Sequence, residues 1–121
     1  MRDAVLARAA RLPAHARRLL EAIAVVPQET EVWLLEALAG ESVNHLEECL
    51  ASGMLRSGQA AVGFRHELAR LTIEQSLPAD RRTTLHRKAL GALLEPPSGA
   101  QDLDRLSHHA EAAYDLSLIH I

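Results

Sequence analysis

Residues 54–68 read MLRSGQAAVGFRHEL, and this stretch decides the fold class. Two short runs without helical periodicity, 54–56 and 61–64, flank the connecting residues 57–60. Within that connection, Gly58 supplies the backbone freedom that a tight turn requires. The stretch therefore predicts a small β-hairpin.

Amphipathic segments with helical spacing precede the hairpin. After a helical lead-in at 3–12, Pro13 opens a segment whose apolar residues recur at the spacing of one buried helix face. A second helix is expected at 31–39, because its apolar run stops at a glycine. A third helix is expected to begin with Ser42 as its N-cap and to end at Gly53.

Further helices are expected after the hairpin. The segment that starts near His66 is predicted to place Leu68 and Ile73 inward and to break before Pro78, which opens the next helix. After a linker rich in Pro and Gly, the last helix is expected to bury Leu103 among its apolar residues.

The fold class predicted from this order is mainly α, because three helices, a hairpin and another helix follow one another as in a winged helix. Ala and Leu dominate the composition, and both favour helices. The last helices are expected to begin a tetratricopeptide-like repeat array. The expected organisation is a lead-in (1–12), a winged-helix-like domain (13–76), a connecting helix (77–95), a linker (96–101), a first repeat helix (102–115) and a non-native tail (116–121).

Charge and cysteine content exclude several classes of protein. The 13 Lys and Arg residues and 16 Asp and Glu residues give a net charge of −3, so no uniform cationic field is present to attract nucleic acid or a membrane. Cys49 is the single cysteine, which excludes an internal disulfide framework. The sequence has no apolar run as long as a membrane span and no signal peptide, so a cytoplasmic location is expected.

The predicted third helix is a poor match for DNA. Between 41 and 52 it carries Glu41, Glu47 and Glu48 and no Lys or Arg, and carboxylates repel phosphates. The basic residues gather instead at 81–88, where they form either a solvated helix face or a protein-interaction face. No direct DNA contact is therefore expected from this segment.

Neither a metal site nor an active site is expected. His45 and Cys49 have the i, i+4 spacing of two ligands, but two ligands do not complete a site, and Cys49 falls on an apolar face. His108 and His109 are adjacent, so their side chains should point about 100° apart and not converge on one ion. The phosphate-binding loop and the common catalytic motifs are absent from the sequence, so the chain is not expected to be an enzyme.

Arg65 and His66 lie where the predicted strand passes into a helix. The free N–H groups and the dipole of a helix N-terminus favour an anion at such a place. His66 is therefore either an ordinary residue at a helix start or a donor to a phosphate, and Arg65 is positioned to pair with the same group.

Several stretches resemble the region that follows the ATPase module in signal-transduction ATPases of the STAND class, many of which are LuxR-family, MalT-like transcriptional regulators. The similarity extends over about residues 2 to 115 and follows a pattern without one invariant motif. The stretches that carry it are VLARAARL (5–12), LLEAIAVV (19–26), FRHELAR (64–70), SLP (76–78), RRTTLH (81–86) and LSHHAEAA (106–113).

The resemblance implies a regulatory role inside a larger protein. In that class a P-loop module binds ATP or ADP, a winged helix packs on it as a lid, and helical repeats sense a ligand or partner. Related innate-immunity receptors carry a Met-His-Asp run at the same junction, with its His near the ADP β-phosphate. Arg65-His66-Glu67 aligns with that run, with Arg in place of Met and Glu in place of Asp.

The resemblance also defines the expected partners and cofactors. The partners are the ATPase module and the helical repeats of the same protein, with no membrane involved. No cofactor is expected in residues 1–121 themselves, whereas the whole protein would bind ATP or ADP. Residues 116–121 resemble translated sequencing adapter, so they are excluded from fold reasoning.

Overall fold

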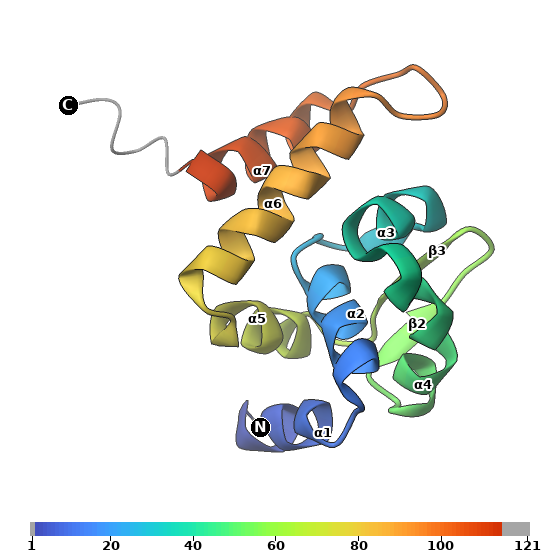
Figure 1. Ribbon diagram of the computed structural model, residues 1–121, viewed down its shortest axis with the longest axis vertical. Helices are drawn as coiled ribbons and strands as arrows, with labels where there is room; N and C mark the ends of the chain where they lie inside the picture. The colour runs from blue at the N-terminus through green and yellow to red at the C-terminus, as the bar shows by residue number, and fades with distance from the viewer. Residues whose placement is uncertain (1, 115–121) are drawn as a thin grey trace. The chain divides into compact units, whose positions relative to one another are not determined.

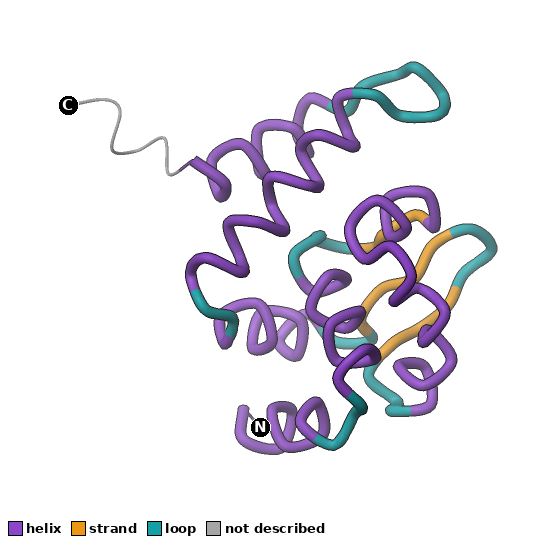
Figure 2. The backbone as a smooth tube through the Cα atoms, viewed as in Figure 1, coloured by secondary structure: helices purple, strands orange, loops and turns teal. Residues whose placement is uncertain are grey.

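The structure is a computed structural model that describes residues 2–114, so the predicted non-native tail at 116–121 lies outside the described residues. The described chain is mainly helical with one small antiparallel sheet of three strands (Figures 1 and 2). It divides into two compact units, Met1–Leu77 and Pro78–Ile121. The boundary lies one residue from the one expected after position 76.

The first unit contains three β-strands, with helices before, between and after them along the sequence. α1, predicted to be a lead-in apart from the next domain, packs against α5 and α2 in this unit. The elements are, in order, α1 (Arg2–Ala10), α2 (Ala14–Ala24), β1 (Glu29–Glu31), α3 (Val32–Ala39), the 3₁₀ helix η1 (Gly40–His45), α4 (Leu46–Ala51), β2 (Leu55–Ser57), β3 (Ala61–Phe64) and α5 (Glu67–Ser76).

The predicted hairpin is confirmed as β2 and β3, which pair antiparallel with Leu55 opposite Phe64. The turn does not depend on a left-handed backbone at Gly58; its N–H instead donates to the carbonyl oxygen of Ala61 at 2.8 Å. A third strand, β1, was not predicted. It pairs antiparallel with the other edge of β3, which gives the strand order β1-β3-β2.

The core of the first unit lies between the helices and the sheet. Because α2 presents its apolar residues at helical spacing, one face of it is completely buried. α3 and the hairpin supply the facing side chains. The largest of the fully buried apolar side chains are Leu19, Leu20, Ile23, Leu34, Leu35 and Leu55.

The third helix differs from the prediction. Ser42 does not cap it, because residues 40–45 form η1 and α4 begins only at Leu46. α5 also differs, since Leu68 is 63% exposed. The inward face of α5 is formed by Ala69, Arg70 and Ile73, and an arginine at one of these positions conceals the apolar stripe in the sequence.

The second unit is a pair of helices, α6 (Ala79–Leu94) and α7 (Leu103–Tyr114), which lie side by side and are joined by a loop (Figure 1). Leu103 is 73% exposed, so the prediction that it is buried is wrong. It lies about 120° around the helix from His109, which is buried. Within residues 2–114, none of the helices combines the length and the apolar character that a bilayer crossing requires.

Candidate functional site

His66 occupies the junction between β3 and α5. Its backbone is extended (φ −132°, ψ 127°) at the N-cap position of α5, and its imidazole makes no capping hydrogen bond. The side chain is exposed. The ring therefore does not cap α5, and it lies where a helix N-terminus favours a negatively charged group.

A cavity of about 230 Å³ opens beside His66. α1, the turn before β2 and the first turns of α5 form its wall. The guanidinium of Arg8, one of the lining groups, donates from Nη2 to the carbonyl oxygen of Ser52. The lining is mainly apolar apart from the two cationic or potentially cationic side chains, and consists of Ala4, Val5, Arg8, Gly53, Met54, His66 and Ala69.

Arg65 is placed differently from its neighbour. Its backbone N–H donates to the carbonyl oxygen of Met54 at 2.9 Å, and its side-chain Nε donates to the carbonyl oxygen of Leu55 at 3.1 Å. Arg65 is not among the residues that line the cavity. The structure therefore brings His66 together with Arg8 at the cavity and ties Arg65 to the hairpin backbone.

A buried arginine, Arg70, lies in the first turn of α5, directly after this junction. Arg70 is only 4% exposed, and its Nε and Nη2 each donate to one carboxylate oxygen of Glu67 at 2.8 Å. Its Nη1 also donates to Glu74 at 3.2 Å and to the carbonyl oxygen of Ala24 at 2.8 Å. Hydrogen bonding to Arg70 lowers the pKa of Glu67, and the same pair raises the pKa of Arg70.

The network of Glu67, Arg70 and Glu74 is not among the features predicted from the sequence. The spacing of Glu67, Arg70 and Glu74 at i, i+3 and i+7 would have indicated a charged row along one helix face. Such a row is usually solvated, and nothing in the sequence marks Arg70 as the member that turns inward.

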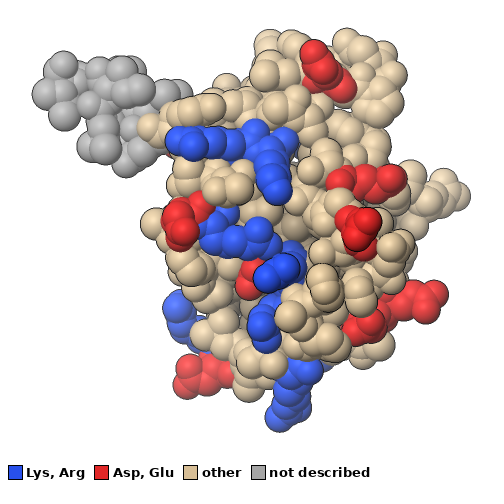
Figure 3. Space-filling view, viewed as in Figure 1, with Lys and Arg blue, Asp and Glu red and all other residues tan. Residues whose placement is uncertain are grey.

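The surface from η1 to α4 is acidic, as the sequence predicted. Glu41, Glu47 and Glu48 are all exposed, and the only basic side chains of the hairpin region are Arg56 and Arg65. Both blue and red groups are present on the face drawn in Figure 3. The segment from η1 to α4 presents carboxylates, and no Lys or Arg, to solvent.

His45 and Cys49 each have another partner in the structure. His45 Nδ1 lies 2.8 Å from a carboxylate oxygen of Glu48, and its ring stacks on that of His15. The buried thiol of Cys49 donates to the carbonyl oxygen of Ala16 at 3.0 Å. Burial raises the pKa of this thiol to about 11, so it stays protonated near neutral pH.

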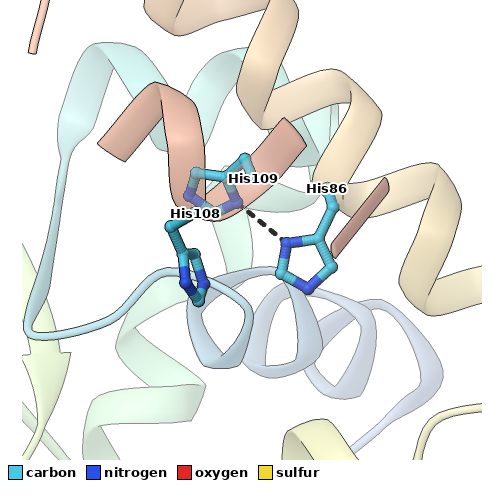
Figure 4. A group of neighbouring side chains, drawn as sticks. All are labelled: His86, His108 and His109. Carbon is cyan, nitrogen blue, oxygen red and sulfur yellow. Dashed lines mark hydrogen bonds between the residues drawn. The ribbon is translucent and has the colours of Figure 1, made fainter. Parts of the chain in front are cut away.

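In the second unit, three histidine rings meet at one place (Figure 4). The prediction that His108 and His109 must point apart is wrong: their ring centroids are 4.9 Å apart, and each ring also contacts His86 of α6. The 100° separation holds for the Cα–Cβ directions, but rotation about the side-chain bonds brings adjacent rings together. His86 and His109 are buried and His108 is exposed.

The basic row of α6 is partly engaged within its own unit. The guanidinium of Arg87 lies 5.1 Å from the centre of the Tyr114 ring, a cation–π contact between α6 and α7. Lys88 is exposed. The guanidinium of Arg87 is therefore engaged by α7, whereas Lys88 extends into solvent.

Comparison of the chain with protein-family models, with curated proteins and with solved structures finds no match.

Proposed function

We propose that residues 13–76 are a winged-helix module that acts as a non-catalytic regulatory lid in a larger ATP-binding transcription regulator of the STAND class. The second unit would link this lid to sensor repeats. The order of elements carries the proposal: α2 precedes β1, the helical elements α3, η1 and α4 lie between β1 and β2, and β3 is central in the sheet. A winged helix has this order, with β2 and β3 as its wing.

The charge of the exposed helical surface favours a lid over a DNA reader. In DNA-binding winged helices the helix before the wing enters the major groove, where it needs donors and positive charge. Here the corresponding segment presents Glu41, Glu47 and Glu48 to solvent. A stand-alone DNA-binding module remains the alternative function, and it is the one that the first experiment tests.

His66 is the residue that would contact the nucleotide. It is exposed at a helix N-terminus and lines a cavity together with Arg8, so both side chains can offer N–H donors to an anion. We propose that the ring donates to the β-phosphate of ADP held by the ATPase module of the same protein. Arg65 would then act by holding the hairpin backbone through its hydrogen bonds to Met54 and Leu55, and not by contacting the phosphate.

A DNA titration separates the two functions. A fluorescently labelled random duplex is titrated with the 121-residue chain at low salt, where cationic DNA-binding proteins bind even non-specific sequences. A lid should show no binding tighter than about micromolar. Nanomolar binding would instead support the DNA-binding alternative.

The nucleotide contact is tested in the full-length protein. His66→Ala should speed ADP release by about one to two orders of magnitude, because a charge-assisted hydrogen bond contributes about 1.5–3 kcal/mol. His45→Gln is the matched control, since this histidine lies away from the cavity lining. Unchanged ADP retention in a folded His66→Ala protein would show that His66 is an ordinary residue at a helix start.

A further inference from the structure

The histidine cluster of the second unit has the geometry of a metal site. One ring nitrogen from each of His86, His108 and His109 can be chosen so that all three lie within 4.8 Å of one another. Figure 4 shows His86 and His109 directed toward each other from two helices, with His108 beside them. Helices α6 and α7 therefore both contribute to one small group of nitrogen donors.

The distances between the ring nitrogens would have to change only slightly for the three rings to bind one metal ion. Nitrogen ligands about 2.1 Å from a tetrahedral Zn²⁺ lie about 3.4 Å from one another. His86 Nδ1 and His109 Nδ1 are 2.8 Å apart and share a hydrogen bond, so this pair would separate slightly. His108 is exposed, and its ring would have to shift toward the buried pair, because the chosen nitrogens of the three rings lie within 4.8 Å of one another and not within 3.4 Å.

The two buried rings already turn nitrogen atoms toward each other. In the hydrogen bond between His86 Nδ1 and His109 Nδ1, one of the two nitrogens accepts, so it carries no proton and has a lone pair that can coordinate a metal. One of the two rings donates its Nδ1 proton in the His86–His109 hydrogen bond. When Zn²⁺ binds that Nδ1, the ring would carry its proton on Nε2 instead.

The donor set selects the class of ion. Mg²⁺ and Ca²⁺ prefer oxygen ligands, whereas imidazole suits Zn²⁺ and its first-row neighbours. Arg105 is close enough to interact electrostatically with His109, and its charge would oppose a cation bound there. Only an ion that forms strong bonds to imidazole can overcome this repulsion.

We propose that His86, His108 and His109 form a Zn²⁺ site with water as the fourth ligand. Three protein ligands and one water are a common zinc arrangement. Because the ligands come from α6 and α7, the ion would fasten the two helices to each other. The site is independent of the nucleotide contact proposed for His66.

Zinc binding is measured by isothermal titration calorimetry on the 121-residue chain, prepared metal-free and without a polyhistidine tag, at pH 7.5. ZnCl₂ should bind with one ion per chain at the cluster, and MgCl₂ should not bind. His108→Gln should weaken zinc binding by at least about tenfold, since even the loss of a residue that only supports a ligand costs that much. His108 is the variant of choice because it is exposed, and its removal leaves the buried pair intact.

His45→Gln is the matched control, because His45 is partly exposed and belongs to the separate pair with His15. It should leave the zinc affinity unchanged. NMR spectra of the imidazole groups give a second readout, in which Zn²⁺ should shift the signals of His86 and His109 but not those of His66. Absence of zinc binding, binding that survives His108→Gln, or binding that is lost in His45→Gln would each overturn the proposal.

Discussion

Arg70 Nη1 donates to the carbonyl oxygen of Ala24 at 2.8 Å, which joins the buried face of α5 to the last residue of α2. A carbonyl group at a helix C-terminus has no partner within its own helix and carries part of the negative end of the helix dipole. The guanidinium satisfies this group and holds both Glu67 and Glu74 as well. Arg70 thus positions the helix whose first turn carries the cavity beside His66.

We expect Arg70→Met to lower the free energy of unfolding of the first unit by about 3 kcal/mol. The substitution keeps much of the side-chain volume but removes the hydrogen bonds from Arg70 to the Ala24 carbonyl and to Glu74. Urea denaturation followed by circular dichroism gives the change. Arg17→Ala, at an exposed position of α2, is the control and should change the unfolding free energy by less than about 0.5 kcal/mol.

Gly63 allows β1 to approach β3. A Cβ atom at this position would lie 2.6 Å from the carbonyl oxygen of Gln28, which is a backbone atom and cannot rotate away. Gly63→Ala should therefore destabilise the first unit by about 1–3 kcal/mol, as overpacking does. Gly58→Ala in the hairpin connection is the matched control, because its Cβ would meet nothing closer than 3.6 Å. Equal urea midpoints for the two variants would contradict this explanation of Gly63.

Thr30 lies in the middle of β1 and is fully buried. Its Oγ1 has no hydrogen-bond partner among the described residues, which is costly for a buried hydroxyl. Thr30→Val replaces the hydroxyl by a methyl group of similar shape and should raise the free energy of unfolding by about 1 kcal/mol. Differential scanning calorimetry measures the gain. A loss of stability would show that the hydroxyl is satisfied in solution.

The sequence predicts the hairpin and the helices around it well, because these depend on local spacing and on Pro and Gly. It does not predict β1, since Glu29-Thr30-Glu31 is short, polar and outside any alternating apolar run. This strand exists because β3 offers it an edge and Gly63 gives it room. Both conditions are tertiary, and no local pattern contains them.

The candidate site was likewise predictable only in its local features. The strand-to-helix junction identified His66 from local sequence, but the cavity beside it depends on Arg8, which is distant in the chain. The histidine cluster was missed for a similar reason. Adjacent residues suggest divergent directions, and only the packing of α6 on α7 brings His86 to the rings of His108 and His109.

Acid should destabilise the chain through His109. Burial, followed by the charge of neighbouring groups, lowers the pKa of His109 in the folded state from the ordinary 6.5 to about 3. Below about pH 6.5 the unfolded state therefore binds a proton that the folded state does not bind. This contribution to stability is present above about pH 6.5 and is lost as the pH falls toward 3. The groups that face His109 and add to the effect are His86, His108 and Arg105.

The free energy of unfolding, measured by urea denaturation between pH 7.5 and 4.5, should therefore fall more steeply in the native chain than in His109→Gln. The variant removes the group that titrates and leaves other acid-sensitive groups in place, including Glu67 and its salt bridge to Arg70. His66→Gln is the control, because it removes an exposed histidine that is not among the groups acting on His109. Equal slopes in the native chain and in His109→Gln would show that His109 titrates at an ordinary pH and that its ring is accessible to protons in the folded state.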